Sequence, residues 1–372
     1  MTIQDTTVTC STGDAQVPVR RGSSRYGAPP YRREAGEGAV DSEGFDRLTD
    51  PYRPELLAHC YRILGSVHDA EDLVQETYLR AWRAYGGFDG RSSLRFWLYR
   101  IATNVCLTAL EHRSRRFLPA GLGAPGDDPD ETSGLPGSEV EWVQPLPGPA
   151  SDATANDPAS IVVSRGSVRL ALVVALQQLP PKQRVVLILR DVLAWRAAEV
   201  AELLDTTTTA VNSSLQRARA HLERVAPTED DITEPLDADH QALLDRYVRA
   251  FENADIDTLL RVLRSDVTLE MPPEPLWFAG HEAVGRFVAS RIFVGPGVLR
   301  LLPVTANGQP ALATYWRGED GVFRAHAIQV LTMSGNKVAR MVIFREPSLF
   351  PAFGLPRDLG VAGPASHDSA RA

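Results

Sequence analysis

Residues 197–222 read AAEVAELLDTTTTAVNSSLQRARAHL, and this stretch decides the fold of the middle of the chain. Small and apolar residues recur at helical spacing on both sides of the DTTTT segment, which predicts a short helix, a tight turn and a longer helix. Asp205 or one of the following threonines can cap the longer helix. The expected core of this helix pair consists of Val200, Leu203, Leu204, Val211, Leu215 and Ala218.

The start of the longer helix carries short polar side chains of the kind that reach base edges in the major groove. These candidates are Thr208, Thr209, Asn212, Ser213 and Gln216, with Arg217 and Arg219 placed to meet phosphates. The pattern over 196–215 is typical of a DNA-binding helix-turn-helix. The alternative is an ordinary helical hairpin with a solvated face, because short helix pairs are common.

Nearer the N-terminus, residues 91–116 form a helical stretch that is both basic and aromatic. It holds six arginines and one acid, with Phe96, Trp97 and Tyr99 between them. Arginines neutralise phosphates, and aromatic rings stack on unpaired bases. The alternative is that the rings are core and the arginines only solubilise, and for Phe96 and Trp97 individually we favour the core.

Residues 69–82 read DAEDLVQETYLRAW and predict an amphipathic helix with acids crowded into its first turns. Acids at that position complement the helix dipole, which explains them without any partner. A docking surface for a basic partner is the functional interpretation. The apolar stripe expected to face inward is Leu73, Val74, Thr77, Tyr78, Ala81 and Trp82.

The composition limits the class of protein. The chain has 372 residues, a net charge of −8 and 44% hydrophobic residues, which is enough for several domains with real cores. Its three cysteines show no ligand spacing, so we expect no disulfide framework, no metal and no cofactor. No apolar run approaches the roughly 18 residues of a membrane span and no secretory signal is visible, so we predict a cytoplasmic protein without membrane contact.

Segments poor in apolar residues separate three ordered blocks. Between Phe117 and Ser160 there are eight acids and no basic residue, which predicts a flexible linker. In the third block, β-like runs separated by NGQP, GED and SGN predict an antiparallel meander and an α+β domain. We divide the chain into a disordered tail (1–44), a first block (45–117), a flexible acidic linker (118–160), a second block (161–226), a third block (237–346) and a mobile tail (347–372).

The first two blocks resemble a known family. DAEDLVQETYLRAW, followed by a glycine-containing loop and FWLYRIATN (96–104), resembles region 2 of the bacterial sigma-70 family. LPPKQRVVLILRDVLAWRAAEVAELLDTTTTAVNSSLQRARAHLE (179–223) resembles region 4. With only a linker between them, they are similar to the small extracytoplasmic-function (group IV) branch, over about 45–225. The resemblance implies a multidomain fold with two all-α sigma domains, the second a helix-turn-helix.

The resemblance also implies partners and contact residues. It implies binding to the β′ and β subunits of core RNA polymerase and to promoter DNA, with promoter-specific initiation and melting of the −10 element. The implied polymerase contact is Asp69, Asp72, Leu73, Val74, Gln75 and Glu76. The implied −10 contact is Phe88, Arg91, Ser92, Arg100 and Asn104. Within it, the loop 88–93 is implied to capture a flipped base and Asn104 to contact the non-template strand. The −35 contact is the helix-turn-helix face given above.

The third block resembles the SnoaL-like branch of the NTF2-like superfamily, in which a curved sheet forms a cone. The resemblance rests on its order of helix, helix, strand, helix and meander and on runs such as HAIQVL. It implies a possible ligand pocket, for which the candidates are Trp277, Trp316, Arg317, His326 and Gln329. The alternative is that these are core and rim residues.

We expect the third block to modulate the sigma domains through a small-molecule ligand or an anti-sigma-like contact. No catalytic residue is assigned, because His326 has no visible carboxylate partner, and the chain is not expected to be an enzyme. Two rival interpretations remain open. One is a helix-turn-helix regulator that works without polymerase, and the other is an enzyme that acts on a small molecule in the cone.

Overall fold

A computed structural model of the chain describes residues 42–111, 115–126, 128, 140–148, 169–225 and 238–361. All of them belong to one compact unit, Asp41–Ala372. The predictions for residues 1–41, for residues 127, 129–139 and 149–160 of the linker, for residues 161–168 of the second block and for residues 362–372 fall outside the described residues.

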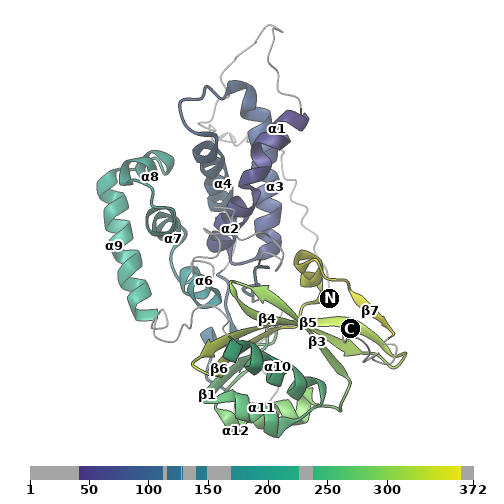
Figure 1. Ribbon diagram of the computed structural model, residues 1–372. Helices are drawn as coiled ribbons and strands as arrows, with labels where there is room; N and C mark the ends of the chain where they lie inside the picture. The colour runs from purple at the N-terminus through teal and green to yellow at the C-terminus, as the bar shows by residue number, and fades with distance from the viewer. Residues whose placement is uncertain are drawn as a thin grey trace, which may run out of the picture. The chain divides into compact units, whose positions relative to one another are not determined.

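The first block is a helical bundle (Figure 1). The α2–α3 corner is set by two residues: Gly65 ends α2 with a left-handed φ of 72°, and the Ser66 hydroxyl accepts the Asp69 N–H that opens α3. Ser93 caps α4 in the same way, through the Phe96 N–H. The elements are α1 (Ser42–Thr49), η1 (Asp50–Tyr52), α2 (Arg53–Leu64), α3 (Val67–Ala84), η2 (Tyr85–Gly87) and α4 (Leu94–Leu110).

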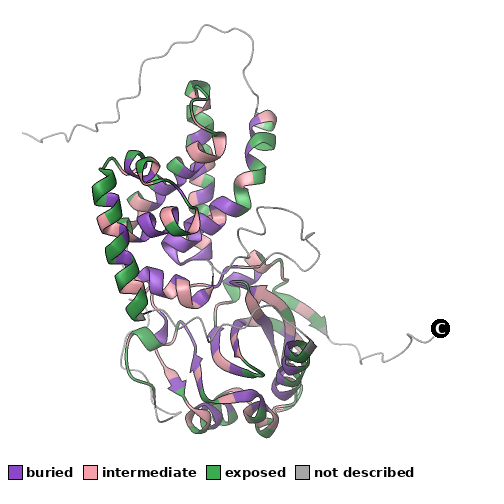
Figure 2. Ribbon diagram, turned by 60° about the vertical axis from the view of Figure 1, so that its left-hand side comes forward, coloured by how far each residue is buried: buried purple, intermediate pink, exposed green. Residues whose placement is uncertain are grey.

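The second block contains the predicted helix-turn-helix. Pro181 starts α7, and the Thr207 hydroxyl accepts the Ala210 N–H at the start of α9, as expected for a threonine cap. Of the predicted core residues all are buried except Leu204, which is half-buried. Figure 2 shows the outer side of α9 as largely exposed. The elements are α6 (Leu170–Gln177), α7 (Pro181–Leu187), the π-helical turn η4 (Ile188–Val192), α8 (Ala197–Leu203) and α9 (Thr208–Val225).

The third block is a curved sheet with helices on one face. The sheet order is β2-β1-β6-β5-β4-β3, with β7 added to β5; strands β3 to β6 form the predicted antiparallel meander, and β1 runs parallel to β6. The helices are α10 (Ala238–Glu252), α11 (Ile256–Val262) and α12 (His281–Phe287), followed by the π-helical turn η6 (Val288–Ile292). The strands are β1 (Leu263–Glu270), β2 (Trp277–Ala279), β3 (Leu299–Ala306), β4 (Gln309–Arg317), β5 (Val322–Ser334), β6 (Lys337–Phe344) and β7 (Asp358–Val361).

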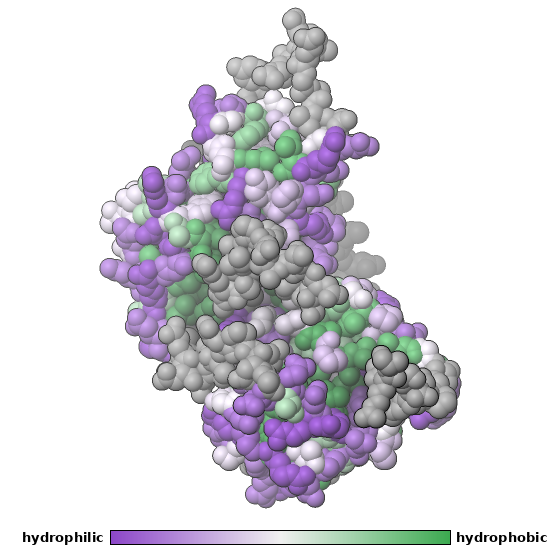
Figure 3. Space-filling model, viewed as in Figure 1, coloured by the Kyte–Doolittle hydropathy of each residue, from purple (hydrophilic) through white to green (hydrophobic). Residues whose placement is uncertain are grey.

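The core of this block lies between the sheet and α10–α12 (Figure 1). Tyr247 and Phe251 of α10 stack with ring centroids 4.7 Å apart, and both are fully buried together with Phe278 and Leu331. Hydrophilic side chains cover much of the visible outer side of the three helices (Figure 3). The amphipathic pattern therefore explains which face of each helix meets the sheet.

Two predictions of mobility are wrong for the residues that the structure describes. Residues 347–361 are ordered: Leu349 and Phe350, in the 3-10 segment η7 (Pro347–Phe353), are fully buried, and β7 pairs with β5. In the linker, residues 117–126 and 140–148 are packed, with Leu118 and Val143 buried. The reason is the same in both places. Each segment has the average composition of a flexible chain, but a few of its apolar side chains are buried and hold it in place.

Candidate nucleic-acid interface

The predicted −35 face is assembled at the start of α9. Thr208, Thr209, Asn212 and Gln216 are exposed and Ser213 is half-buried, all within the first nine residues of the helix. Val211 and Leu215, on the opposite side, are buried, and α9 packs against α7 and α8, which fixes the direction in which the polar side chains point. Such a surface offers donors and acceptors to base edges without requiring desolvation of a charge.

The two arginines expected to meet phosphates differ in their surroundings. Arg217 is exposed, with its guanidinium 3.4 Å from the Ser214 hydroxyl. Arg219 makes a bidentate ion pair with Asp191, at 2.9 and 2.6 Å, from the π-helical turn η4. An exposed pair of this kind contributes little to stability. Arg219 therefore has to exchange Asp191 for a phosphate before it can bind DNA.

The predicted −10 residues lie on α4 and on the loop before it. Arg100 and Asn104 are exposed on α4, and Arg91 in the loop is exposed and paired with Asp89 at 2.8 Å. Phe88 lies against Trp97, with ring centroids 4.9 Å apart, so the loop is held by an aromatic cluster rather than left free. Ser92 is half-buried. These side chains therefore extend from the loop before α4 to Asn104, about 15 Å along the helix from its start.

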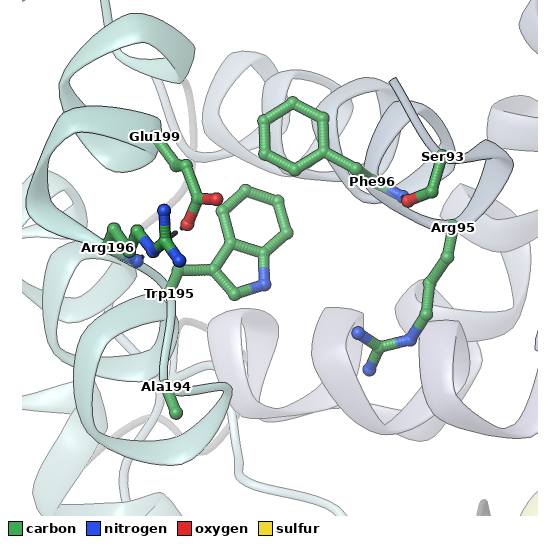
Figure 4. Close-up of a pocket in the computed structure, with 7 residues that line it drawn as sticks. All are labelled: Ser93, Arg95, Phe96, Ala194, Trp195, Arg196 and Glu199. Atoms are coloured by element: carbon green, nitrogen blue, oxygen red, sulfur yellow. Dashed lines mark hydrogen bonds between the residues drawn. The ribbon is translucent and has the colours of Figure 1, made fainter. Parts of the chain in front are cut away.

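Part of that surface is covered by the second block. Phe96 stacks on Trp195 at 4.5 Å between ring centroids and 19° between planes, and Arg100 lies 3.8 Å from Glu202 of α8. The two stacked rings form part of the wall of a pocket of about 370 Å³. Figure 4 shows that Arg95 points away from the rings. The pocket is lined by Ser93, Arg95, Phe96, Ala194, Trp195, Arg196 and Glu199. In this conformation Phe96 is engaged by Trp195 and is not open to a base.

A buried polar network holds α4 against α2 beneath this surface. Arg95 binds the Glu55 carboxylate with two nitrogens, at 2.8 and 2.7 Å, and its guanidinium lies over the Tyr99 ring. Burial, followed by the nearby Arg62 and Arg95 charges, lowers the pKa of His59 to about 3, so this histidine is neutral. His59 lies 2.9 Å from the Thr103 hydroxyl. Sequence reasoning missed this network, because its members are spread over three turns of two helices.

A second buried cation joins the first two blocks. Arg184 of α7 donates to the carbonyl of Ile63 in α2, to the Gln177 side chain at 2.6 Å and to the Leu179 carbonyl at 3.1 Å. Burial lowers its pKa to about 10, which still leaves the guanidinium charged. A buried arginine whose two terminal nitrogens are both bonded is costly to replace. It therefore fixes the contact between the two helical blocks.

The predicted polymerase-binding residues of α3 do not form one surface. Asp72 and Gln75 are exposed, Glu76 is partly exposed and pairs with Arg80 at 2.6 Å, and Leu73 is half-buried. Val74 is fully buried and belongs to the core. The Asp69 carboxylate is largely buried in an ion pair with Arg116 at 2.6 Å. The predicted contact is thus reduced to the exposed acids and amide along one side of the helix.

Two apolar side chains extend that side of α3. Leu79 is 50% exposed and Trp82 41% exposed, although the sequence pattern assigned Trp82 to the inward stripe. Trp82 instead contacts Phe45 of α1 edge-on at 5.3 Å. Exposed large apolar residues next to acids are typical of a protein-binding surface, and the helical period alone gave no sign of it.

Comparison with known proteins agrees with this arrangement. Residues 48–116 match the sigma-70 region 2 family, residues 169–222 match sigma-70 region 4, and residues 244–341 match the SnoaL-like domain. The ECF RNA polymerase sigma factor SigG of Mycobacterium tuberculosis is 51% identical over 85% of this chain and 85% of its own length.

The chain belongs to the ECF RNA polymerase sigma factors. SigJ of the same organism is 30% identical over 80% of this chain and 90% of its own length. The crystal structure of the M. tuberculosis extracytoplasmic function sigma factor SigJ matches with a TM-score of 0.57 at 26% identity, covering 83% of this chain and 99% of that one. The two helical blocks are therefore the sigma domains, and the third block is the SnoaL-like domain of this ECF sigma factor.

The candidate pocket residues of the SnoaL-like block are not brought together. Trp316 and His326 are neighbours, with ring centroids 5.3 Å apart, and His326 is the extra residue of a β-bulge in β5. Burial and the Arg345 charge lower the pKa of His326 to about 4. Trp277 lies on β2, which β1, β6 and β5 separate from the strand of Trp316.

The remaining candidates fare differently. Arg317 is exposed, and Gln329 is buried within the core. The Tyr247 hydroxyl donates to Gln329 at 2.8 Å, and the Gln329 amide donates to the Thr314 hydroxyl at 2.8 Å. This buried network is satisfied by protein groups, so Gln329 acts here as a core residue, in line with the alternative interpretation of these positions.

Among the residues that the structure describes, no helix combines the length and apolar character needed to cross a bilayer. Among the same residues, His, Cys, Asp and Glu side chains form no group suited to holding a metal ion.

Proposed function

We propose that this ECF sigma factor binds the β′ and β subunits of core RNA polymerase in the cytoplasm and directs promoter-specific initiation. The first block would contact polymerase through the exposed side of α3 and the −10 element through α4 and the Phe88–Ser92 loop. The second block would read the −35 element with the start of α9. The observation that carries this proposal is the exposed polar face at Thr208–Gln216, in a chain that belongs to the ECF family.

Dependence on polymerase follows from the weakness of each DNA contact. Each neutralised phosphate contributes a slope of roughly −0.9 to the log–log salt dependence of binding, and the described faces offer few free cations. Mounting both blocks on polymerase raises their effective concentration at the two promoter elements. Selectivity then comes from simultaneous engagement rather than from either block alone.

Run-off transcription with purified core polymerase tests the proposal. We expect the double variant Asn212→Ala, Gln216→Ala to lose promoter-directed transcripts. The control is Glu223→Ala, which should keep them, because Glu223 is exposed at the far end of the same helix. A chain that fails to start transcripts when supplied with core enzyme would contradict the proposal.

Co-purification with polymerase separates a sigma factor from a regulator that works alone. We expect Asp72→Ala combined with Gln75→Ala to weaken the association, and Asp46→Ala on α1, a matched exposed acid, to leave it intact. A stand-alone regulator would bind its promoter without polymerase and would be indifferent to the α3 variants.

We further propose that the SnoaL-like block modulates the sigma domains in cis, as an anti-sigma-like contact rather than an enzyme. The satisfied network at Gln329 and the isolation of His326 from Trp277 support a structural over a catalytic role. Truncation after Thr228 should change the rate or the promoter choice of transcription. His326→Ala should leave transcription unchanged, and a measured turnover lost in that variant would support the enzyme interpretation instead.

A further inference from the structure

The described parts of the linker form a strap, defined here as residues 115–126 and 140–148, that is bound to the first block. Arg116 pairs with Asp69 and donates to the Trp142 carbonyl at 2.8 Å, which joins the two ends of the strap. Gln144 fits into the α2–α3 corner: its N–H donates to the Gly65 carbonyl at 2.9 Å, and its side-chain oxygen accepts from the Ser66 hydroxyl at 2.7 Å.

The same strap is bound to the edge strand β3 of the SnoaL-like sheet. The Gly148 N–H donates to the Thr305 carbonyl and the Asn307 N–H to the Leu146 carbonyl, each at 2.8 Å, so that Pro147 pairs with Ala306 in antiparallel fashion. An edge strand presents unpaired backbone groups, and here the linker covers part of them. This end of the strap is therefore a short extra strand.

The opposite edge of the sheet holds the other end of the strap. The Gly126 N–H donates to the Trp277 carbonyl at 2.8 Å, and the Trp277 indole donates to the Gly123 carbonyl at 2.9 Å. The Ala120 N–H donates to Glu270 at 2.9 Å, and Glu270, 1% exposed, is held in turn by Arg340 at 2.8 Å. Trp277, a candidate for ligand binding, is thus occupied by the linker.

Asn307, in the SnoaL-like block, connects that block to the linker and to the first block. It is 1% exposed, has a φ of 57° and lies in the turn between β3 and β4. Its side-chain oxygen accepts the Leu146 N–H at 2.9 Å, and its amide donates to the Tyr61 hydroxyl of α2 at 2.8 Å. The Tyr61 hydroxyl donates in turn to the Gln144 carbonyl at 2.7 Å. One side chain therefore ties the SnoaL-like block to the linker and to the first block.

We propose that the SnoaL-like block is a clamp on the linker between the two sigma domains, and that the strap must leave β3 before both domains can engage one promoter. This inference rests on the proposed function and specifies how the third block regulates it. The partner of the β3 edge is a named segment of the same chain, residues 146–148.

Chain length supports the need for release. With Gly148 held on β3, the 20 residues at positions 149–168 are what remains before Arg169, and fully stretched they span at most about 70 Å. The names of the −35 and −10 elements place them about 25 base pairs apart. At about 3.4 Å per base pair, this separation is roughly 85 Å on straight DNA. Release of the β3 end alone extends the free chain to residues 145–168, which span at most about 85 Å, because Gln144 still lies in the α2–α3 corner. Release of the whole strap frees residues 118–168, which reach up to about 170 Å.

A reversible cross-link tests the clamp. Pro147 and Ala306 form a non-hydrogen-bonded antiparallel pair, because the flanking bonds run from Gly148 to Thr305 and from Asn307 to Leu146. At such a pair the Cα atoms are about 4.5 Å apart, within the range that a disulfide bridges. The test protein is full-length Pro147→Cys, Ala306→Cys in a Cys10→Ser background, oxidised with diamide or reduced with dithiothreitol. The single-cysteine variants are matched controls.

We expect the reduced protein to support run-off transcription with core polymerase as the wild type does. In the oxidised protein, run-off transcription should decrease at least tenfold, and reduction should restore it. Equal activity of the oxidised and reduced forms would overturn the clamp while leaving the sigma function standing. If even the wild type starts no transcripts with core enzyme, the proposed function itself fails, and the clamp fails with it.

A second variant loosens the clamp without a cross-link. Asn307→Gly keeps the left-handed backbone conformation at no steric cost but loses the bonds to Leu146 and Tyr61. We expect amide exchange at Leu146 and Gly148 to accelerate about tenfold and association with core polymerase to become faster. Asn336→Gly, the same change in an exposed hairpin turn, should alter neither. Unchanged exchange and unchanged association in Asn307→Gly would contradict the clamp.

Discussion

Trp195→Ala should open the contact between the two sigma domains. Trp195 is buried against the first block, stacked on Phe96 and edge-on to Tyr99 at 5.9 Å. Truncating a buried tryptophan costs about 3–5 kcal/mol in total. The ring contacts of Trp195 with Phe96 and Tyr99 cross between the blocks, so we assign about 1–2 kcal/mol of this cost to the domain contact. The ratio of closed to open protein should then fall roughly 5- to 30-fold.

Energy transfer between dyes on the first and second blocks measures this ratio directly in the absence of polymerase. The same protein should bind single-stranded −10 DNA more tightly, because Phe96 is released for stacking on a base. Trp82→Ala is the control, since Trp82 is partly exposed and contacts Phe45 within the first block. If Trp195→Ala changes the energy transfer no more than Trp82→Ala does, the stack does not hold the domains together.

Three further changes have defined outcomes. Burial lowers the pKa of His59 to about 3, so between about pH 6.5 and pH 3 this side chain is protonated in the unfolded chain and neutral in the folded one. The free energy of unfolding should therefore fall as the pH drops from about 6.5 towards 3. His59→Asn should remove this contribution to the pH dependence of the free energy measured by urea unfolding. Glu270→Gln leaves the partly buried Arg340 without its carboxylate and should cost about 2–3 kcal/mol, measured as a lower unfolding midpoint. Asp191→Asn frees Arg219 and should steepen the log–log salt slope of DNA binding by about 0.9.

Two of these changes have a matched control. For Glu270 it is Glu274→Gln, which breaks an exposed pair with Arg345 and should cost less than about 1 kcal/mol. For Asp191 it is Asp257→Asn, an acid of α11 in the third block, which should leave the salt slope unchanged. A His59→Asn protein with the wild-type pH slope would show that another group titrates over that range.

Local sequence patterns predicted the helices and strands, but they could not predict which side chains pair with partners far along the chain. The helix-turn-helix and the meander were predictable because their apolar periods are set by neighbours a few residues away. The buried charges were not: Arg184 and Glu270 look like surface residues until partners far along the chain satisfy them. Asp69 was expected to face polymerase, but its partner Arg116 lies 47 residues away.

The linker shows the same limit of composition. Its proline, glycine and acidic residues indicated a flexible chain, and the apolar anchors Leu118, Val143 and Leu146 are too few to register as a pattern. The candidate ligand pocket shows a related limit. Element order alone cannot show that β2 and β4 lie strands apart, nor that Trp277 bonds to the linker.

The strap and the β3 edge lie on the same polypeptide chain, and this has a consequence for gene dosage. A separate inhibitor can be outnumbered when its target is overproduced, but a restraint carried on the same polypeptide is always present in a one-to-one ratio. Its local concentration is set by chain length, at millimolar order for short connections. Under the proposed clamp, raising the cellular copy number would therefore add restrained and unrestrained molecules in constant proportion, and induction of the gene and release of its product would be two independent controls.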